Sequence, residues 1–83
     1  MEKVLVNLYV PEIEVSYDLF IPVDLTVRSV INVVLEGLSV IQSGKYYRTG
    51  NEKIIVRSLN AVLHPDRLLK DYPIQDGDQL VLM

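Results

Sequence analysis

The spacing of the apolar residues changes between residues 21 and 27, and this change limits the folds that the chain can adopt. Through residues 3–21 the apolar side chains recur at every second position, in two runs separated by a short break. That period is typical of strands with one buried face, so the sequence predicts a hairpin of strands at 3–10 and 13–21. Between 27 and 41 the spacing becomes three and four residues, which predicts an amphipathic helix. The expected buried face of this helix is formed by Val27, Val30, Ile31, Val34, Leu38 and Ile41.

The predicted helix carries signals at both of its ends. Thr26 is expected to be the N-cap, because its hydroxyl can accept a hydrogen bond from the first turn. Gly44 is expected to stop the helix, because glycine readily takes the left-handed conformation found at helix ends. The many valines and isoleucines of the segment and Gly37 are weak helix formers. The helix must therefore be stabilised by packing against a sheet.

The residues after the helix predict the rest of the sheet. A polar loop at 43–52 leads to a strand at 53–58, a short strand at 61–63 and a last strand at 79–83. This order indicates an α+β domain over residues 1–83, with a mixed sheet of four to five strands packed on one helix. It is the β-grasp plan, in which the first and last strands are expected to lie side by side in the middle of the sheet.

The composition of the chain narrows the classes of function. Its 83 residues contain no cysteine and carry a net charge of −3. We therefore expect no disulfide, thiolate metal site or cysteine nucleophile, and the chain suits a reducing cytoplasm. The acidic balance disfavours nucleic acid, whose phosphates are bound by clustered lysine and arginine. No apolar run approaches the roughly 20 residues of a membrane span, so direct membrane insertion is not expected.

Residues with catalytic or metal-binding chemistry are few. His64 is the only histidine, and no nucleophile motif accompanies it, so a surface or turn role is favoured over a catalytic one. The segment Asp76-Gly77-Asp78 lacks the longer oxygen-rich pattern of a calcium loop and is predicted to be a turn. The sequence thus predicts no enzymatic activity, metal or cofactor.

Two sets of side chains are candidates for binding another protein. The first set belongs to the strand face turned away from the helix and to the turn beside it: Leu5, Tyr9, Ile55, Arg57 and Leu59. Together they would form a docking patch, whereas scattered they would be ordinary exposed residues. The second set lies on the flank of the helix and in the following loop: Val33, Val40, Tyr46 and Tyr47. Either the loop at 43–52 folds over the two valines, or this set forms a partner or dimer surface.

The carboxy-terminal third resembles a known family. Residues 69–82 read Leu-Lys-Asp-Tyr-Pro-Ile-Gln-Asp-Gly-Asp-Gln-Leu-Val-Leu, which is similar to the ubiquitin pattern Leu-Ser-Asp-Tyr-Asn-Ile-Gln followed by a hydrophobic last strand. By this resemblance the Tyr72 ring is expected to be buried, with its hydroxyl bonded to a main-chain group. Nearly the whole chain also resembles the ubiquitin-like YukD and EsaB proteins of bacterial type VII secretion systems. The motifs that carry this likeness are Tyr17–Pro22, Leu25–Ile31 and Asp71–Asp78.

The family resemblance implies a function. It implies a non-catalytic, cytoplasmic protein-interaction module with a ubiquitin-like fold, acting as an accessory or regulatory component of type VII secretion. The expected partner is another protein of that machinery or one of its regulators, and a homodimer is also open. As an alternative, the chain is the excised cytosolic domain of a larger membrane component. Because the sequence ends at Met83 without a terminal Gly-Gly, we expect that it is not conjugated to targets as ubiquitin is.

Overall fold

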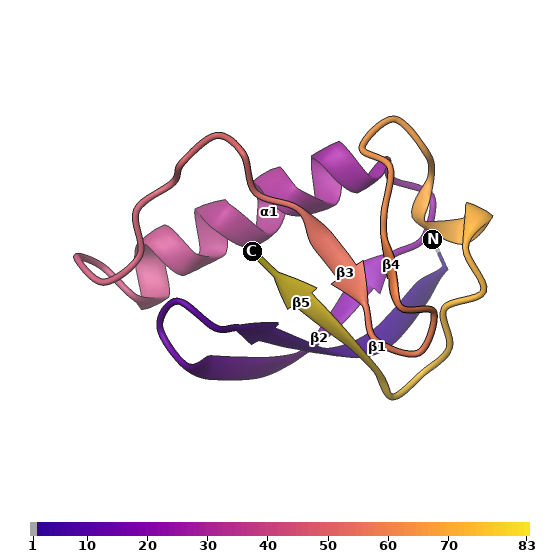
Figure 1. The fold of residues 1–83 in the computed structure, drawn as a ribbon, viewed down its shortest axis with the longest axis horizontal. Helices are drawn as coiled ribbons and strands as arrows, with labels where there is room; N and C mark the ends of the chain where they lie inside the picture. The colour runs from indigo at the N-terminus through magenta and orange to yellow at the C-terminus, as the bar shows by residue number, and fades with distance from the viewer. Residues whose placement is uncertain (1) are drawn as a thin grey trace.

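The structure, a computed structural model, describes residues 2–83 as one sheet and one α-helix (Figure 1). Helix α1 crosses one face of the sheet, and the opposite face carries no α-helix among the described residues. This arrangement confirms the expected class, a mixed sheet packed on one helix, and the sheet has five strands. The elements are β1 (Lys3–Val10), β2 (Val15–Pro22), α1 (Val27–Ile41), β3 (Ile54–Val56), β4 (Ala61–Val62), the 3₁₀ helix η1 (Leu69–Asp71) and β5 (Asp78–Leu82).

The first and last strands lie side by side, as the sequence predicts. The strand order is β2-β1-β5-β3-β4, so β1 and β5 are interior strands and β2 and β4 form the two edges. Strand β1 runs parallel to β5, with Leu8 beside Leu80, and the other neighbouring strands are antiparallel. A parallel pair needs a long crossover connection, which here contains the helix and the rest of the chain.

The β1–β2 hairpin turns over four residues, and β2 begins at Val15, two residues later than predicted. The Ile13 N–H donates to the Val10 carbonyl at 3.3 Å, and the Glu14 N–H donates to the Pro11 carbonyl at 3.1 Å. Glu14 has a φ of 54°, a left-handed conformation that ends the turn. Ile13 fits the alternating pattern although it lies in the turn, because its side chain packs against the core.

Helix α1 begins as predicted, with the Thr26 hydroxyl accepting a hydrogen bond from the Ser29 N–H at 3.2 Å. The helix ends at Ile41 with Gln42 as its C-cap, and Gly44, at a φ of 81°, takes the left-handed conformation in the turn that follows, two residues beyond the cap. The predicted buried face needs two corrections. Leu35, which was not assigned to it, is buried, whereas Ile41 is 64% exposed. Ile41 differs because it lies on the side of the helix that faces β2, away from the centre of the sheet.

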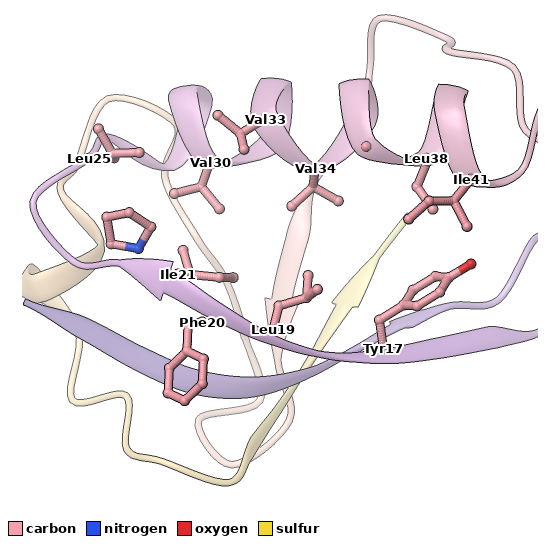
Figure 2. A pocket seen from close by; sticks show the side chains of 12 residues that line it. Tyr17, Leu19, Phe20, Ile21, Leu25, Val30, Val33, Val34, Leu38 and Ile41 are labelled. Atoms are coloured by element: carbon pink, nitrogen blue, oxygen red, sulfur yellow. The ribbon is translucent and has the colours of Figure 1, made fainter.

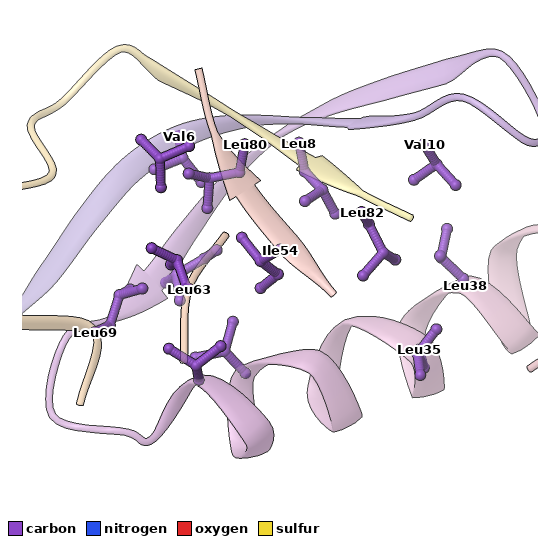
Figure 3. Close-up of a cluster of buried hydrophobic side chains, with 14 of the residues drawn as sticks. Val6, Leu8, Val10, Leu35, Leu38, Ile54, Leu63, Leu69, Leu80 and Leu82 are labelled. Atoms are coloured by element: carbon purple, nitrogen blue, oxygen red, sulfur yellow. The ribbon is translucent and has the colours of Figure 1, made fainter. Parts of the chain in front are cut away.

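The core lies between α1 and the covered face of the sheet (Figure 3). It contains alternate side chains of β1, β3 and β5 and the inner side of α1. Each fully buried aliphatic side chain contributes about 1.5–3 kcal/mol, which is how burial stabilises a helix rich in weak formers. The largest fully buried side chains are Leu8, Leu35, Ile54, Leu69, Leu80, Leu82, Val6, Val10, Val27, Val30 and Val56.

The second half of the chain contains less regular structure than predicted. Strands β3 and β4 span three and two residues, shorter than the predicted 53–58 and 61–63, and η1 was not predicted as a helix. The half-buried Tyr72 accepts a hydrogen bond from the His64 N–H at 2.8 Å on its hydroxyl, which confirms its expected main-chain contact. Gly77, at a φ of 91°, confirms the predicted turn. Within residues 2–83 no helix has the length and apolar character needed to cross a membrane.

Candidate functional site

The face of the sheet turned away from α1, called here the open face, carries a continuous apolar row. Tyr9 on β1 lies beside Val81 on β5, which lies opposite Ile55 on β3, which lies opposite Val62 on β4. Residues directly opposite each other share one face of a sheet and contact across the strands. These four residues are defined as the apolar row. It spans four strands and ends at Val62, whose side chain is 56% exposed.

A polar row runs beside the apolar row on the same face. The Asn7 side-chain amide donates to the Asp18 carboxylate at 3.1 Å, and the Gln79 amide donates to the Asn7 side-chain oxygen at 2.9 Å. These bonds link β2, β1 and β5, so the three side chains are held in one orientation. The polar row therefore separates the apolar row from the part of the open face that contains Leu5 and Phe20.

The first candidate set is divided by this pattern. Tyr9 and Ile55 are brought together through Val81, but Leu5 lies beyond the polar row, opposite the exposed Phe20. The exposed Arg57 follows β3, and its N–H donates to the Gln79 carbonyl at 3.2 Å. Leu59 is half-buried and packs against the core.

Three residues of the open face were missed from the sequence: Val81, Val62 and Phe20. Strict alternation along the last strand would have directed Val81 to the open face, because Leu80 and Leu82 on either side of it point into the core. The orientation of Val62 depends on its pairing with Ile55, which two strand residues cannot indicate by themselves.

The second candidate set is also divided. Val33 and Val40 are 59% and 80% exposed, so the loop at 43–52 does not fold over them, and Tyr47 is exposed as well. Tyr46 is a correction: it is 8% exposed and belongs to the core cluster. Its ring packs in the core, and its hydroxyl donates to the Glu52 carboxylate at 3.1 Å.

Glu52 organises that loop. Its carboxylate also accepts hydrogen bonds from the Thr49 N–H at 2.7 Å and the Gly50 N–H at 3.1 Å. Burial of the Glu52 carboxyl favours its neutral form, but these hydrogen bonds outweigh burial and lower its pKa. Burial raises the pKa of the Tyr46 hydroxyl, and the hydrogen bond to the Glu52 carboxylate raises it further, to about 12.

His64 stabilises the turn in which it lies. Its N–H donates to the Tyr72 hydroxyl, and its Nδ1 accepts a hydrogen bond from the Asp66 N–H at 3.1 Å. Across residues 2–83, no group of three or more histidine, aspartate and glutamate side chains is placed to hold a metal ion.

An apolar groove of about 220 Å³ lies between β2 and α1. Figure 2 shows Tyr17, Leu19 and Ile21 pointing from β2 toward the helix, while Phe20 points to the other side of the strand. From α1 the lining includes Val33 and Ile41, which are exposed. At one end the Gln42 side-chain amide donates to the Tyr17 hydroxyl at 2.6 Å and joins the two elements.

Comparison with known families gives one match over nearly the whole chain. The family model described as "WXG100 protein secretion system (Wss), protein YukD" matches residues 4–82. A search of curated proteins finds no match.

Solved structures share the ubiquitin-like fold. The ubiquitin-like domain of the Mycobacterium tuberculosis type VII secretion protein ECCD1 is 20% identical, covering 100% of this chain and 99% of that one, with a TM-score of 0.75. The EccD5 ubiquitin-like domain from Mycobacterium xenopi is 16% identical, with coverages of 100% and 94% and a TM-score of 0.73. A chain of the MycP5-free ESX-5 inner membrane complex is 19% identical, with a TM-score of 0.71; the match covers 100% of this chain and 21% of that one.

Proposed function

Because the chain belongs to the YukD family of the WXG100 protein secretion system, we propose that it is a protein-interaction module which binds a component or regulator of that system on its open face. Membership confirms the family resemblance found in the sequence, and the chain is a ubiquitin-like domain of type VII secretion. The proposal adds that the module is non-catalytic, acts in the cytoplasm, and serves as an accessory or regulatory component.

The observation that carries the proposal is the apolar row. Tyr9, Val81, Ile55 and Val62 form a continuous apolar strip on a face that no helix covers within residues 2–83. Val62 is exposed, Tyr9 and Ile55 are half-buried, and Val81 is only 7% exposed, so the row is open at Val62 and partly open at Tyr9 and Ile55. Scattered exposed apolar residues need no explanation, but contiguous ones at a surface favour a protein contact. Tyrosine at such a position is typical of interface residues that contribute much of the binding energy. The adjacent polar row offers side chains already held in place, which suits the rim of an interface.

The test places a charge in the apolar row without disturbing the core. Val62→Glu changes an exposed side chain of an edge strand, and we expect the variant to keep the far-UV circular dichroism spectrum and melting temperature of the parent protein. In cells we expect it to lose co-purification with proteins of the secretion system and to change the secretion of WXG100 proteins.

The control is Ser39→Glu, which places the same charge on an exposed residue of α1, outside the apolar row and outside both candidate sets. It should retain co-purification and secretion. If Val62→Glu also retains both at the level of the parent protein, the open face is not the docking surface.

A second candidate function is that of a cytosolic domain within a larger membrane component. This alternative is favoured by the fold likeness to one chain of an inner membrane complex. The match covers 21% of the length of that chain. An immunoblot of the native cells, with an antibody against this domain, distinguishes the two. A band near 9.5 kDa in the soluble fraction supports the accessory protein, and a larger band in the membrane fraction supports the domain.

A further inference from the structure

We propose that the groove between β2 and α1 binds an extended apolar segment of another protein, flanked by lysine or arginine, which pairs with β2 as an added strand. This surface lies apart from the apolar row, so the inference stands independently of the proposed function. Three features of the groove carry it: its lining, the free backbone of β2 and the charges around it.

The lining is apolar and accessible. Tyr17 and Leu19 of β2 are half-buried, and Val33 and Ile41 of α1 are exposed. Gly37 faces the groove, and a Cβ built on it would meet no heavy atom within 4 Å. The groove has a volume of about 220 Å³ and an apolar wall that is open to solvent. Apolar side chains that replace solvent at this wall gain free energy from burial.

The backbone of β2 is available for pairing. Strand β2 is an edge strand of eight residues, and hydrogen bonds alternate along an antiparallel pair. The Val23 N–H donates to the Glu2 carbonyl, so every second residue before Val23 on β2 also bonds to β1. The residues between them, Ser16, Asp18 and Phe20, therefore direct their N–H and C=O groups away from β1, toward the open edge. Strand β1 shows the same pattern. The Leu5 carbonyl, opposite Phe20, accepts a hydrogen bond from the Gly77 N–H on the β5 side, so Leu5 does not bond to Phe20.

The edge lacks most of the features that discourage pairing. Edge strands are usually blunted by charged side chains, lysine above all, by proline within the strand, by bulges or by being very short. Strand β2 contains no lysine, its one charged residue is Asp18, and its proline is the last residue. The other edge, β4, is two residues long. An added strand would therefore find a long template at β2, with alternate side chains directed into the groove, a known mode of peptide recognition.

The charges around the groove select the partner. None of the lining residues is charged. Glu12 and Glu14 lie in the turn that precedes β2. Asp18 lies on the strand with its carboxylate on the open face, where it accepts a hydrogen bond from Asn7, so it would border an added strand from that side. Glu36 lies three residues after Val33 and four before Val40, on the same flank of α1. The ion pairs among residues 2–83 are Arg28–Asp66 and Lys70–Asp24, so none of these four carboxylates is in one. A segment with basic flanks complements them.

The same charges disfavour a second copy of this chain as the occupant. Antiparallel pairing of β2 with itself centred at Asp18 would place two carboxylates directly opposite each other, which destabilises a pair of strands. Each copy also carries a net charge of −3. The groove therefore fits a basic partner better than it fits itself.

The test uses two blocked synthetic peptides, Lys-Lys-Val-Thr-Val-Ile-Val-Lys-Lys and the same core with glutamate at all four flanking positions. Binding to the whole chain is followed by amide chemical shifts and by hydrogen exchange. We expect the lysine peptide to bind at least about tenfold more tightly than the glutamate peptide. Binding of the lysine peptide should slow hydrogen exchange of the Ser16, Asp18 and Phe20 amides, because in the unbound protein these amides point away from β1 and bond to no neighbouring strand.

The groove is then closed with Gly37→Leu and compared with Gly37→Ala. The larger side chain should fill the lining and weaken binding of the lysine peptide by about tenfold or more, and the alanine variant should bind like the parent protein. Val62→Glu should also bind like the parent, which separates this site from the apolar row. A Gly37→Leu variant that binds as tightly as Gly37→Ala overturns the proposal.

Three further outcomes also overturn it. They are shift changes centred on Tyr9 and Ile55 instead of β2, the absence of binding by the lysine peptide, and equal binding of both peptides. If sedimentation shows the chain to be a dimer with the β2 amides already protected, the occupant is a second copy and the proposed partner is wrong.

Discussion

A single carboxylate determines the conformation of the longest loop. Glu52 accepts hydrogen bonds from the Tyr46 hydroxyl and from two backbone N–H groups of the loop. These bonds hold Tyr46 in the core while its neighbour Tyr47 remains exposed. The two are adjacent residues of the same type in a polar loop, so the difference between them could not be predicted from the residue types. It depends on Glu52, five residues beyond Tyr47, which no periodic pattern connects to either ring.

The bond between Tyr46 and Glu52 predicts a dependence of stability on alkaline pH. The pKa of Tyr46 is about 12 in the folded chain, against a usual value of 10.0. A group whose pKa is raised by folding stabilises the protein fully below the unfolded pKa, so this contribution is present below pH 10 and is lost as pH rises toward 12. In an ultraviolet absorbance titration of the five tyrosines, one phenol should ionise late. Tyr46→Phe should remove that late step, and Tyr47→Phe should leave it in place.

At the scale of the elements, long periodic segments were predicted well and short ones were not. The bounds of β1 and α1 were predicted correctly from their periods, although the buried face of α1 needed the corrections at Leu35 and Ile41. Strand β3 and η1 were misjudged because three residues are too few to establish a period. Strand β3 depends on its pairing with β5, which lies more than 20 residues further along the chain. The groove was not predicted, since it arises from the distance between two elements.

The turn of the β1–β2 hairpin predicts a stabilising substitution. Glu14 has a φ of 54°, a conformation that disfavours side chains with a Cβ by about 1–2 kcal/mol. Glycine takes this conformation freely, although it loses more entropy on folding. We expect Glu14→Gly to stabilise the protein by up to about 1 kcal/mol, raising the melting temperature by about 4–8 °C.

The control for this substitution is Glu12→Gly in the same turn, which removes an equivalent exposed carboxylate at a residue without a positive φ. It should leave stability unchanged or lower it slightly. If both variants shift the melting temperature equally, the effect comes from charge and not from the backbone of Glu14.

At the scale of the whole molecule, one helix and one sheet leave more apolar surface than they can cover. The exposed large apolar side chains include Phe20, Val33, Val40, Ile41 and Val62. All but Val62 belong to β2 or α1, the two elements that bound the groove. A two-layer fold has one covered face, so the open face and the gap between the edge strand and the helix remain accessible. The apolar row and the groove are therefore consequences of the architecture.

The position of β5 predicts how this small molecule unfolds. Strand β5 joins β1 to β3, so the two halves of the sheet meet only through it. Leu80 is fully buried at its centre. Leu80→Ala should destabilise the protein by about 2–5 kcal/mol, a large part of the 5–15 kcal/mol that stabilises a typical protein. At about 4–8 °C for each kcal/mol in a domain of this size, the melting temperature should fall by at least about 8 °C. Val62→Ala, at an exposed site of edge strand β4, should change stability by less than about 0.5 kcal/mol.

Because β5 connects both halves of the sheet, the loss should be cooperative. The far-UV signal of the backbone and the near-UV signal of the tyrosines should disappear at one temperature in Leu80→Ala, as they do for a two-state domain. Separate transitions would mean that the β1–β2 hairpin with α1 persists without β3 and β4. In that case the groove could form without the apolar row, and the two surfaces would belong to parts of the chain that fold independently.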